Sequence, residues 1–480
     1  MNLLRKNKPA AFLLCLLLSC SIIASCENVS LPESSTDSTS SATTSGGTSS
    51  PTDSVDPSLK YVGGEFTIAI TSEQQVPFSA DPNTDDIIGL ASLARNDKLS
   101  EACGIDLKYK VVSAETVSAD MDAAKMAGVN YADILCLPAR TLSKLADGGY
   151  LYNLLSSPNF NIEEAYINSQ AAKSMAGNNT LYMLFDSSSQ YYEETWAVFY
   201  DKQLVEGTGL PDPASVVKSG QWTWSEFIKY SEAVSQKTMS KGSPDTATDI
   251  FGFSSYNNTA ELPLIIWESC GFKLFGDTFG SPVTFKADTA ELNKHAKALQ
   301  NIYLSKSRFP IQGEDAISAF KNGRLGFFVY KLGFSSALAQ SGRDWGILPL
   351  PKYTVEQTSY NSYVDPNAHA LAIPATATDP NKSVLALNML CATSKDSMKE
   401  ALYNKYVNLY FTNNTSTVML DAVMNSVYFD FATIYASGMP AIADVTTKII
   451  VDVVSKKGSE YTLIPKTKTE FQNYAAKVFK

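Results

Sequence analysis

Residues that could carry enzyme chemistry are sparse in this chain of 480 residues. It contains two histidines, His295 and His369, which are too few for a histidine-based triad or a His-x-x-x-His zinc site. Ser215 and Lys218 match the short S-x-x-K pattern, but the companion motifs of the acylases that use it are missing. Carboxylate pairs for glycoside hydrolysis stay open, because the fold sets their geometry. The sequence therefore favours a function without catalysis and leaves a carbohydrate-active enzyme as an alternative.

Cysteines and acidic clusters also fail to form a metal site. The four cysteines after residue 100 are far apart, and none is in a C-x-x-C pair. Cys136 lies in an apolar run and is expected to be a small buried side chain. Asp81, Asp85 and Asp86 lack the spacing of a calcium loop and predict a solvated acidic loop. We therefore expect neither a metal nor a cofactor.

Cys26 is the cysteine with the most informative surroundings. Basic residues between positions 5 and 8 precede an apolar stretch at 12–18, which is the pattern of an export signal and is too short for a membrane span. Residues 23–26, Ile-Ala-Ser-Cys, resemble the lipobox of bacterial lipoproteins. That resemblance implies that residues 1–25 are removed and that Cys26 carries a lipid on its sulfur.

A Ser- and Thr-rich segment follows this cysteine. Residues 26–57 contain almost no large apolar side chain, so we expect a disordered linker between the lipid and the folded body. Removal of the signal takes away three cations and no acid, which changes the formal net charge from -10 to -13. An acidic protein of this kind is a poor partner for nucleic acid. The membrane contact expected is the lipid anchor alone.

Strand-like and helix-like patterns alternate along the body, as is typical of α/β folds. Strands are predicted at 65–71, 106–112, 132–137, 195–201, 323–330, 345–351 and 368–374. Helices are predicted at 86–102, at 114–126, at 381–393 and in the tail from 416 onward.

Two capping patterns predict further helix starts. Thr223 and Glu226 make a capping box, and Trp222 can pack against Phe227 as a hydrophobic staple, so Trp222 is expected to be structural. Residues 288–291 make a second box before a helix that holds His295, which we expect to pack or to lie on the surface.

Several blocks, in chain order, resemble family 1 of the extracellular solute-binding proteins, which deliver sugars to ABC importers. The blocks cover nearly all of the body; they are 132–135 with 145–151, 196–202 with 207–210 and 223–227, 263–271, 320–330, 346–351 and 370–374. Cys270 stands where the family has the first glycine of a pair. The resemblance implies a two-lobed, periplasmic-binding-protein-like (type II) α/β fold with hinge strands and with the ligand between the lobes.

The same resemblance implies where the chain changes lobe. Crossings are expected near 184–194, at 363–367 and near 410. Lobe 1 would hold 58–186 and 364–410, and lobe 2 would hold 187–363 and 411–480.

Sugars have apolar C–H faces and a rim of hydroxyls, so their sites combine aromatic planes with amides and carboxylates. On this basis the candidate ligand-binding residues are Gln74, Gln75, Tyr191, Tyr192, Glu193, Trp267, Tyr330, Phe334, Tyr363 and Asp365. Trp196 and Trp345 lie within predicted strands and are expected in the core.

The sequence thus predicts a monomeric, lipid-anchored substrate-binding protein on the extracytoplasmic face of the membrane. Its partners would be a mono- or oligosaccharide and the permease subunits of an ABC importer. The alternatives are a surface lipoprotein that binds or senses a solute without transport, and the enzyme considered above.

Overall fold

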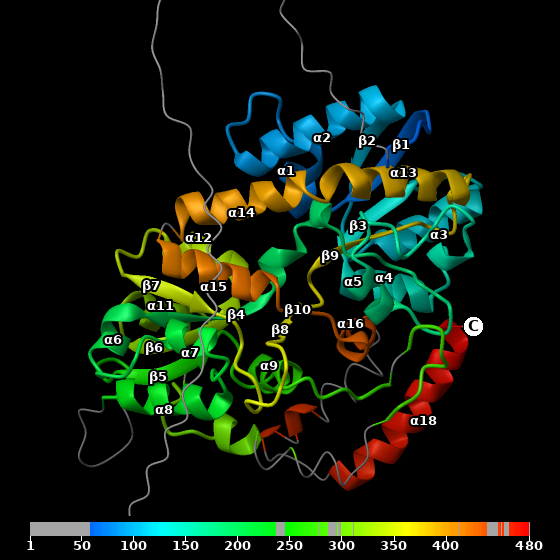
Figure 1. Ribbon diagram of the computed structural model, residues 1–480. Coiled ribbons are helices and arrows are strands. Elements are labelled where there is room, and N and C mark those ends of the chain that lie inside the picture. Colours follow the sequence, from blue (N-terminus) through cyan, green and yellow to red (C-terminus); the bar gives the residue numbers. More distant parts are fainter. Residues whose placement is uncertain are drawn as a thin grey trace, which may run out of the picture. The chain divides into compact units, whose positions relative to one another are not determined.

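Two four-stranded sheets organise the chain in the computed structural model (Figure 1). The structure describes residues 58–236, 245–276, 278–286, 295, 299–310, 312–411, 413–438, 450–452, 454–455 and 460–479. All of them belong to one compact unit. The predicted signal peptide, Cys26, the linker and the capping box at 288–291 lie outside the described residues.

The first sheet has the strand order β2-β1-β3-β9. Its strands are β1 (Gly64–Ile70), β2 (Ile105–Val111), β3 (Ile134–Pro138) and β9 (His369–Ala372). The first three are parallel, and β9 runs antiparallel to β3 with Cys136 opposite Leu371. Residues 134–137 are buried, as the uninterrupted apolar run predicts for a central strand.

Helix α2 (Ile87–Cys103) connects β1 to β2, and both of its ends follow from the sequence. The side chain of Asp86 accepts hydrogen bonds from the backbone N–H groups of Ile88 and Gly89, so it caps the helix. Gly104 takes the left-handed conformation that ends it, with φ +65°. The prediction that Asp86 belongs to an ordinary loop and not to a calcium site is consistent with this local role.

The second sheet has the order β5-β6-β4-β7. Its strands are β4 (Trp196–Asp201), β5 (Phe251–Ser255), β6 (Leu325–Lys331) and β7 (Trp345–Leu348). Strands β5 and β6 are parallel, and β4 lies antiparallel between β6 and β7. Strand β7 is shorter than predicted because Pro349 and Pro351 lack the N–H that a ladder needs.

Helix α8 (Trp224–Val234) begins where the capping box predicts. The Thr223 hydroxyl accepts from the backbone N–H of Glu226 at 3.3 Å. Trp222 is fully buried, its ring lies 6.0 Å from that of Phe227, and its Nε1 donates to the carbonyl of Pro349. The prediction of a structural Trp222 is confirmed.

The chain passes from one sheet to the other more than once. Leu184 pairs with Leu371 of β9, and β4 begins at Trp196. The return runs from β8 (Ser362–Tyr363), which pairs with β10 (Val427–Tyr428), to β9. Helix α13 (Pro380–Ser394) and helix α14 (Ser397–Leu409) pack on α2, and α15 (Asn414–Met424) packs on β7 (Figure 1).

The last part of the chain returns to the helices of the first sheet. Helix α16 (Phe431–Ser437) and helix α18 (Glu460–Val478) contact α4 (Ala139–Asp147). Lys477 Nζ lies 2.7 Å from Asp147 Oδ1. The division into two lobes stays a prediction. It assigned 411–480 to lobe 2 and did not include these contacts between that segment and α4.

The other helices are α1 (Gln75–Ser79), α3 (Val117–Ala127), α5 (Ser169–Met175), α6 (Lys202–Glu206), α7 (Pro213–Lys218), α9 (Glu261–Ser269), α11 (Glu314–Lys321) and α12 (Ser335–Leu338). Short 3-10 turns are found at Ser72–Gln74, Leu154–Ser156, Ser187–Ser189, Tyr191–Glu194 and Leu332–Phe334. Cys103, Cys136, Cys270 and Cys391 are buried and unpaired in disulfides. No helix in these described ranges is long and apolar enough to cross a membrane.

Candidate functional site

The carboxyl ends of β1, β2 and β3 meet at one edge of the first sheet, because the three strands are parallel. In open α/β sheets this is the edge at which ligands bind. A cavity of about 850 Å³ lies there, which we call the sheet-edge cavity. It is lined by Thr71, Ser72, Glu73, Val111, Val112, Ser113, Ala114, Glu115, Pro138, Arg140, Thr141, Lys144, Glu194, Asn367 and His369.

The loop after β1 and the first residue of β9 are joined by a hydrogen bond. Thr71 Oγ1 and His369 Nε2 are 2.8 Å apart. Burial lowers the pKa of His369 to about 4, so its imidazole is neutral at pH 7. The Thr71 hydroxyl lowers the pKa of Glu73, which is therefore a carboxylate. This part of the cavity offers both neutral and charged hydrogen-bonding groups.

Arg140 is held at the cavity by the backbone around it. Its N–H donates to the carbonyl of Pro366, and the N–H of Ala139 donates to the carbonyl of Ala368. The first turn of α4 is therefore fixed to the segment before β9. The Arg140 side chain is exposed and lines the cavity.

An ion cluster adjoins the cavity where the chain crosses into the second sheet. Lys331, at the end of β6, lies 2.6 Å from Glu194 Oε2 and 3.5 Å from Asp365 Oδ2. Trp196 Nε1 donates to the same Asp365 oxygen at 3.3 Å. The backbone N–H of Asp365 donates to the carbonyl of Glu194. These contacts fix Glu194, which lines the cavity, against both strands.

The charges of this cluster influence one another. Burial alone would lower the pKa of Lys331, but the carboxylates of Asp365 and Glu194 together raise it. Burial raises the pKa of Glu194, with Lys331 opposing the shift. Glu261, the first residue of α9, also has a pKa raised by burial, and its charge interacts with Asp365 and Arg140. Glu261 Oε2 is buried without a hydrogen-bond partner among the described residues, so it can accept from a ligand.

Aromatic side chains stand beside the cluster. Tyr256 follows β5 and stacks on Tyr330 of β6, with ring centroids 5.3 Å apart and planes 26° apart. Strands β5 and β6 are parallel, so their carboxyl ends place both rings at the same edge of the second sheet. Tyr330 also contacts Trp196 and Phe334 edge-on.

The arrangement suits a polar ligand with an apolar face. Carboxylates, a guanidinium, hydroxyls and an amide line the cavity, and the ion cluster that includes Glu194 lies between it and the tyrosine pair's neighbour Lys331. Within the described ranges, His, Cys, Asp and Glu form no group of three that could hold a metal ion.

Residues 94–427 match the family model of the bacterial extracellular solute-binding protein. The chain belongs to this family. The match covers both sheets except β1, and it includes Arg140, Glu194, Lys331 and Asp365. A comparison with curated proteins found no match.

Solved structures of binding proteins share the fold of this solute-binding protein. The GacH receptor of Streptomyces glaucescens, solved unliganded and with acarbose, is 15% identical, with a TM-score of 0.53 over 86% of this chain and 99% of that one. The sugar-binding protein MalE of Xanthomonas citri is 14% identical, with a TM-score of 0.56 over 86% and 98%. A cyclo/maltodextrin-binding protein complexed with maltotetraose is 14% identical, with a TM-score of 0.56 over 88% and 97%.

The solute-binding protein places three of the predicted ligand residues together. Asp365 is in the ion cluster, Tyr330 is in the stacked pair, and Phe334 packs against Tyr330 at 5.2 Å. Whether they touch a ligand stays a prediction.

The other predicted residues lie elsewhere. Gln74 is buried near the Cys136 thiol, whereas Gln75 is exposed on α1. Tyr191 and Tyr192 are buried, with ring centroids 4.2 Å apart, and line a different cavity of about 270 Å³. Glu193 lies 3.7 Å from Lys405.

Two further candidates are packed in the interior. Trp267 is buried and packs against Phe272. Tyr363 is fully buried in β8. His295, expected to pack, stacks on Phe272 with ring centroids 3.8 Å apart.

Sequence reasoning missed the charged residues of the site, namely Glu73, Arg140, Glu194, Glu261 and Lys331, together with the neutral His369 and Tyr256. A usable signal existed for Arg140, which comes two residues after a buried parallel strand. No sequence signal existed for Lys331 and Glu194, since only the fold brings them together.

Proposed function

We propose that this solute-binding protein captures a mono- or oligosaccharide at the sheet-edge cavity and delivers it to the permease of an ABC importer. The proposal rests mainly on the position of this cavity at the carboxyl ends of β1, β2 and β3, with charged and hydrogen-bonding side chains in its lining. Solved structures of the same fold include complexes with acarbose and with maltotetraose.

Residues from both sheets would hold the sugar. Arg140 and Glu73 would hydrogen-bond its hydroxyls from the first sheet, and Glu194 and Glu261 would do so from the crossing and from α9. Tyr256 and Tyr330 would cover an apolar ring face. A ligand that contacts both sides favours the closed state only by the contacts it gains there.

A panel of neutral sugars tests the proposal by thermal shift. We expect one class of sugar to raise the unfolding temperature, with the sugar recovered intact. Arg140→Ala should reduce the shift. Conversion of the sugar into products would instead support an enzyme, and the absence of any shift across the panel would contradict the proposal.

We also propose that the protein is a monomer anchored through lipid on Cys26, on the extracytoplasmic face. The lipobox-like residues 23–26 support this. Labelling with an alkyne fatty acid should mark the protein, and Cys26→Ala should abolish the label. A label that persists in Cys26→Ala would refute this anchor.

A further inference from the structure

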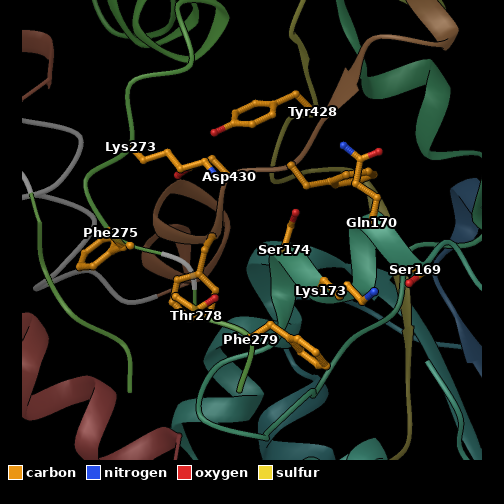
Figure 2. A pocket seen from close by; sticks show the side chains of 13 residues that line it. Ser169, Gln170, Lys173, Ser174, Lys273, Phe275, Thr278, Phe279, Tyr428 and Asp430 are labelled. Carbon is orange, nitrogen blue, oxygen red and sulfur yellow. The ribbon is translucent and has the colours of Figure 1, made fainter. Parts of the chain in front are cut away.

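A second cavity, of about 670 Å³, lies apart from the sheet-edge cavity and shares none of its lining residues. We call it the α5 pocket. It is bounded by α5, by residues 273–276 and 278–279, and by residues 428–431, the last of which lead from β10 into α16 (Figure 2). Its volume lies within the usual range for small-molecule sites, roughly 300–1,000 Å³.

Tyr428 lines this pocket, and its hydroxyl is buried without a partner among the described residues. Tyr428 Oη is shielded from solvent and makes no hydrogen bond to the described residues. Burial raises the pKa of Tyr428 well above its ordinary value, so the hydroxyl stays protonated and can donate as well as accept. A buried hydroxyl of this kind normally has a partner. A ligand hydroxyl would supply one.

Other polar groups face the same space. Figure 2 shows the Ser174 hydroxyl and the Gln170 amide projecting from α5 on the side of Tyr428 and Asp430. Asp430 Oδ1 accepts from the backbone N–H of Thr433 at 2.7 Å, which fixes the carboxylate at the start of α16. Hydroxyl, amide and carboxylate are the groups that bind sugar hydroxyls.

Aromatic rings also line the pocket. Phe275 and Phe431 line the pocket with ring centroids 6.4 Å apart. Phe279 lines it as well and is 39% exposed. Rings of this kind cover the apolar C–H face of a small ring ligand.

The charges around the pocket are largely compensated. Lys173 Nζ lies 2.6 Å from Glu163 Oε1. Burial raises the pKa of Asp430, and the charge of Lys273 opposes that shift. Figure 2 shows Lys273 extending toward Asp430. A site without a strong excess of either sign favours a neutral ligand over an ion.

We propose that the α5 pocket is a second binding site, for a neutral mono- or disaccharide. The sugar would donate or accept at Tyr428 Oη, hydrogen-bond Ser174 and Asp430, and place an apolar face on Phe275 or Phe279. This site is independent of the proposed function of the sheet-edge cavity.

Titration calorimetry with glucose, galactose, maltose and trehalose tests the proposal. The protein used carries Arg140→Ala and Glu194→Gln, which should weaken sugar binding at the sheet-edge cavity. We expect saturable binding of at least one of these sugars to remain. Adding Tyr428→Phe should weaken that binding about three- to tenfold, as expected for one hydrogen bond. Ser174→Ala should weaken it similarly.

Tyr131→Phe is the matched control, because Tyr131 Oη is also buried without a partner among the described residues but lies outside the pocket. It should leave the binding unchanged. The proposal is overturned if the doubly substituted protein binds none of the four sugars, or if Tyr428→Phe and Tyr131→Phe behave alike. The proposed sugar binding at the sheet-edge cavity is tested separately, by the thermal shift of the protein that carries Arg140→Ala alone. It fails if that substitution leaves the shift unchanged.

Discussion

Replacing Lys331 with Met should destabilise the protein and make its stability depend on pH in a new way. Lys331 lies 2.6 Å from Glu194 and 3.5 Å from Asp365, and its side chain is 17% exposed. An exposed ion pair contributes about 0.2–1 kcal/mol, whereas removing one partner of a buried pair costs about 3–5 kcal/mol. Glu194 is partly exposed, so solvent screens part of the effect. We therefore expect a loss of about 2–3 kcal/mol at neutral pH.

The sign of the pH effect follows from the Glu194 carboxylate. Without Lys331 the folded-state pKa of Glu194 rises further, because nothing offsets its burial and its repulsion by Asp365. A carboxylate with a raised folded pKa destabilises the protein above that pKa, and the penalty disappears as it protonates. The difference between Lys331→Met and the parent should therefore shrink between about pH 7 and about pH 5.

Urea unfolding at both pH values measures these differences. Lys202→Met is the matched control, since Lys202 lies 2.6 Å from Asp344, which is 63% exposed. It should cost about 0.2–1 kcal/mol. Equal losses in the two variants, or a Lys331→Met deficit that does not change with pH, would refute the reasoning.

Three further predictions concern the cavity and its supports. Arg140→Ala should weaken sugar binding about tenfold or more without lowering the unfolding midpoint, because the side chain is exposed; calorimetry and urea unfolding check both parts. Gly438→Ala should cost about 1–3 kcal/mol in urea unfolding, because a Cβ would lie 2.4 Å from the carbonyl oxygen of Arg140. Gly128→Ala is the control for backbone strain without a clash, because Gly128 has a φ of +66° and open space around it. It should lower the free energy of unfolding by about 1–2 kcal/mol. Burial lowers the pKa of His369 to about 4, so between pH 6.5 and pH 4 the unfolded chain binds a proton at this residue and the folded protein does not. The free energy of unfolding should therefore fall as the pH drops from 6.5 to 4. His369→Gln should reduce that fall when unfolding is measured across this pH range.

Elements with local signals could be predicted from the sequence. The start of α8 follows from the box formed by Thr223 and Glu226 and from the Trp222 staple, all of which act within one turn. Strand β3 follows from an unbroken apolar run. The family resemblance supplied the two-lobed α/β fold, which local patterns do not contain.

The charged site could not be predicted, because it depends on pairing between distant segments. Lys331 meets Glu194 because the register of β4 and β6 sets Trp196 opposite Lys331. Asp365 joins them because Thr195 pairs with Val364. Both partners come from separate parts of the chain, and no short motif links them.

The placement of the tyrosines at the first crossing has a backbone cause. Gln190 takes a left-handed φ of 55°, and a single 3-10 turn follows at Tyr191–Glu194. That turn directs the two tyrosines into the interior and leaves Glu194 at the cavity. A sequence of four polar and aromatic residues gives no indication of which will face the ligand.

The late entry of β9 into the first sheet has a consequence for biogenesis. During synthesis β3 stays an edge strand, with one ladder of backbone groups unpaired, until residues 369–372 have been made after the whole second sheet. Helices α13 and α14, which cover α2, come later still. The first sheet therefore acquires its fourth strand, and α2 its cover, only after the second sheet has been synthesised.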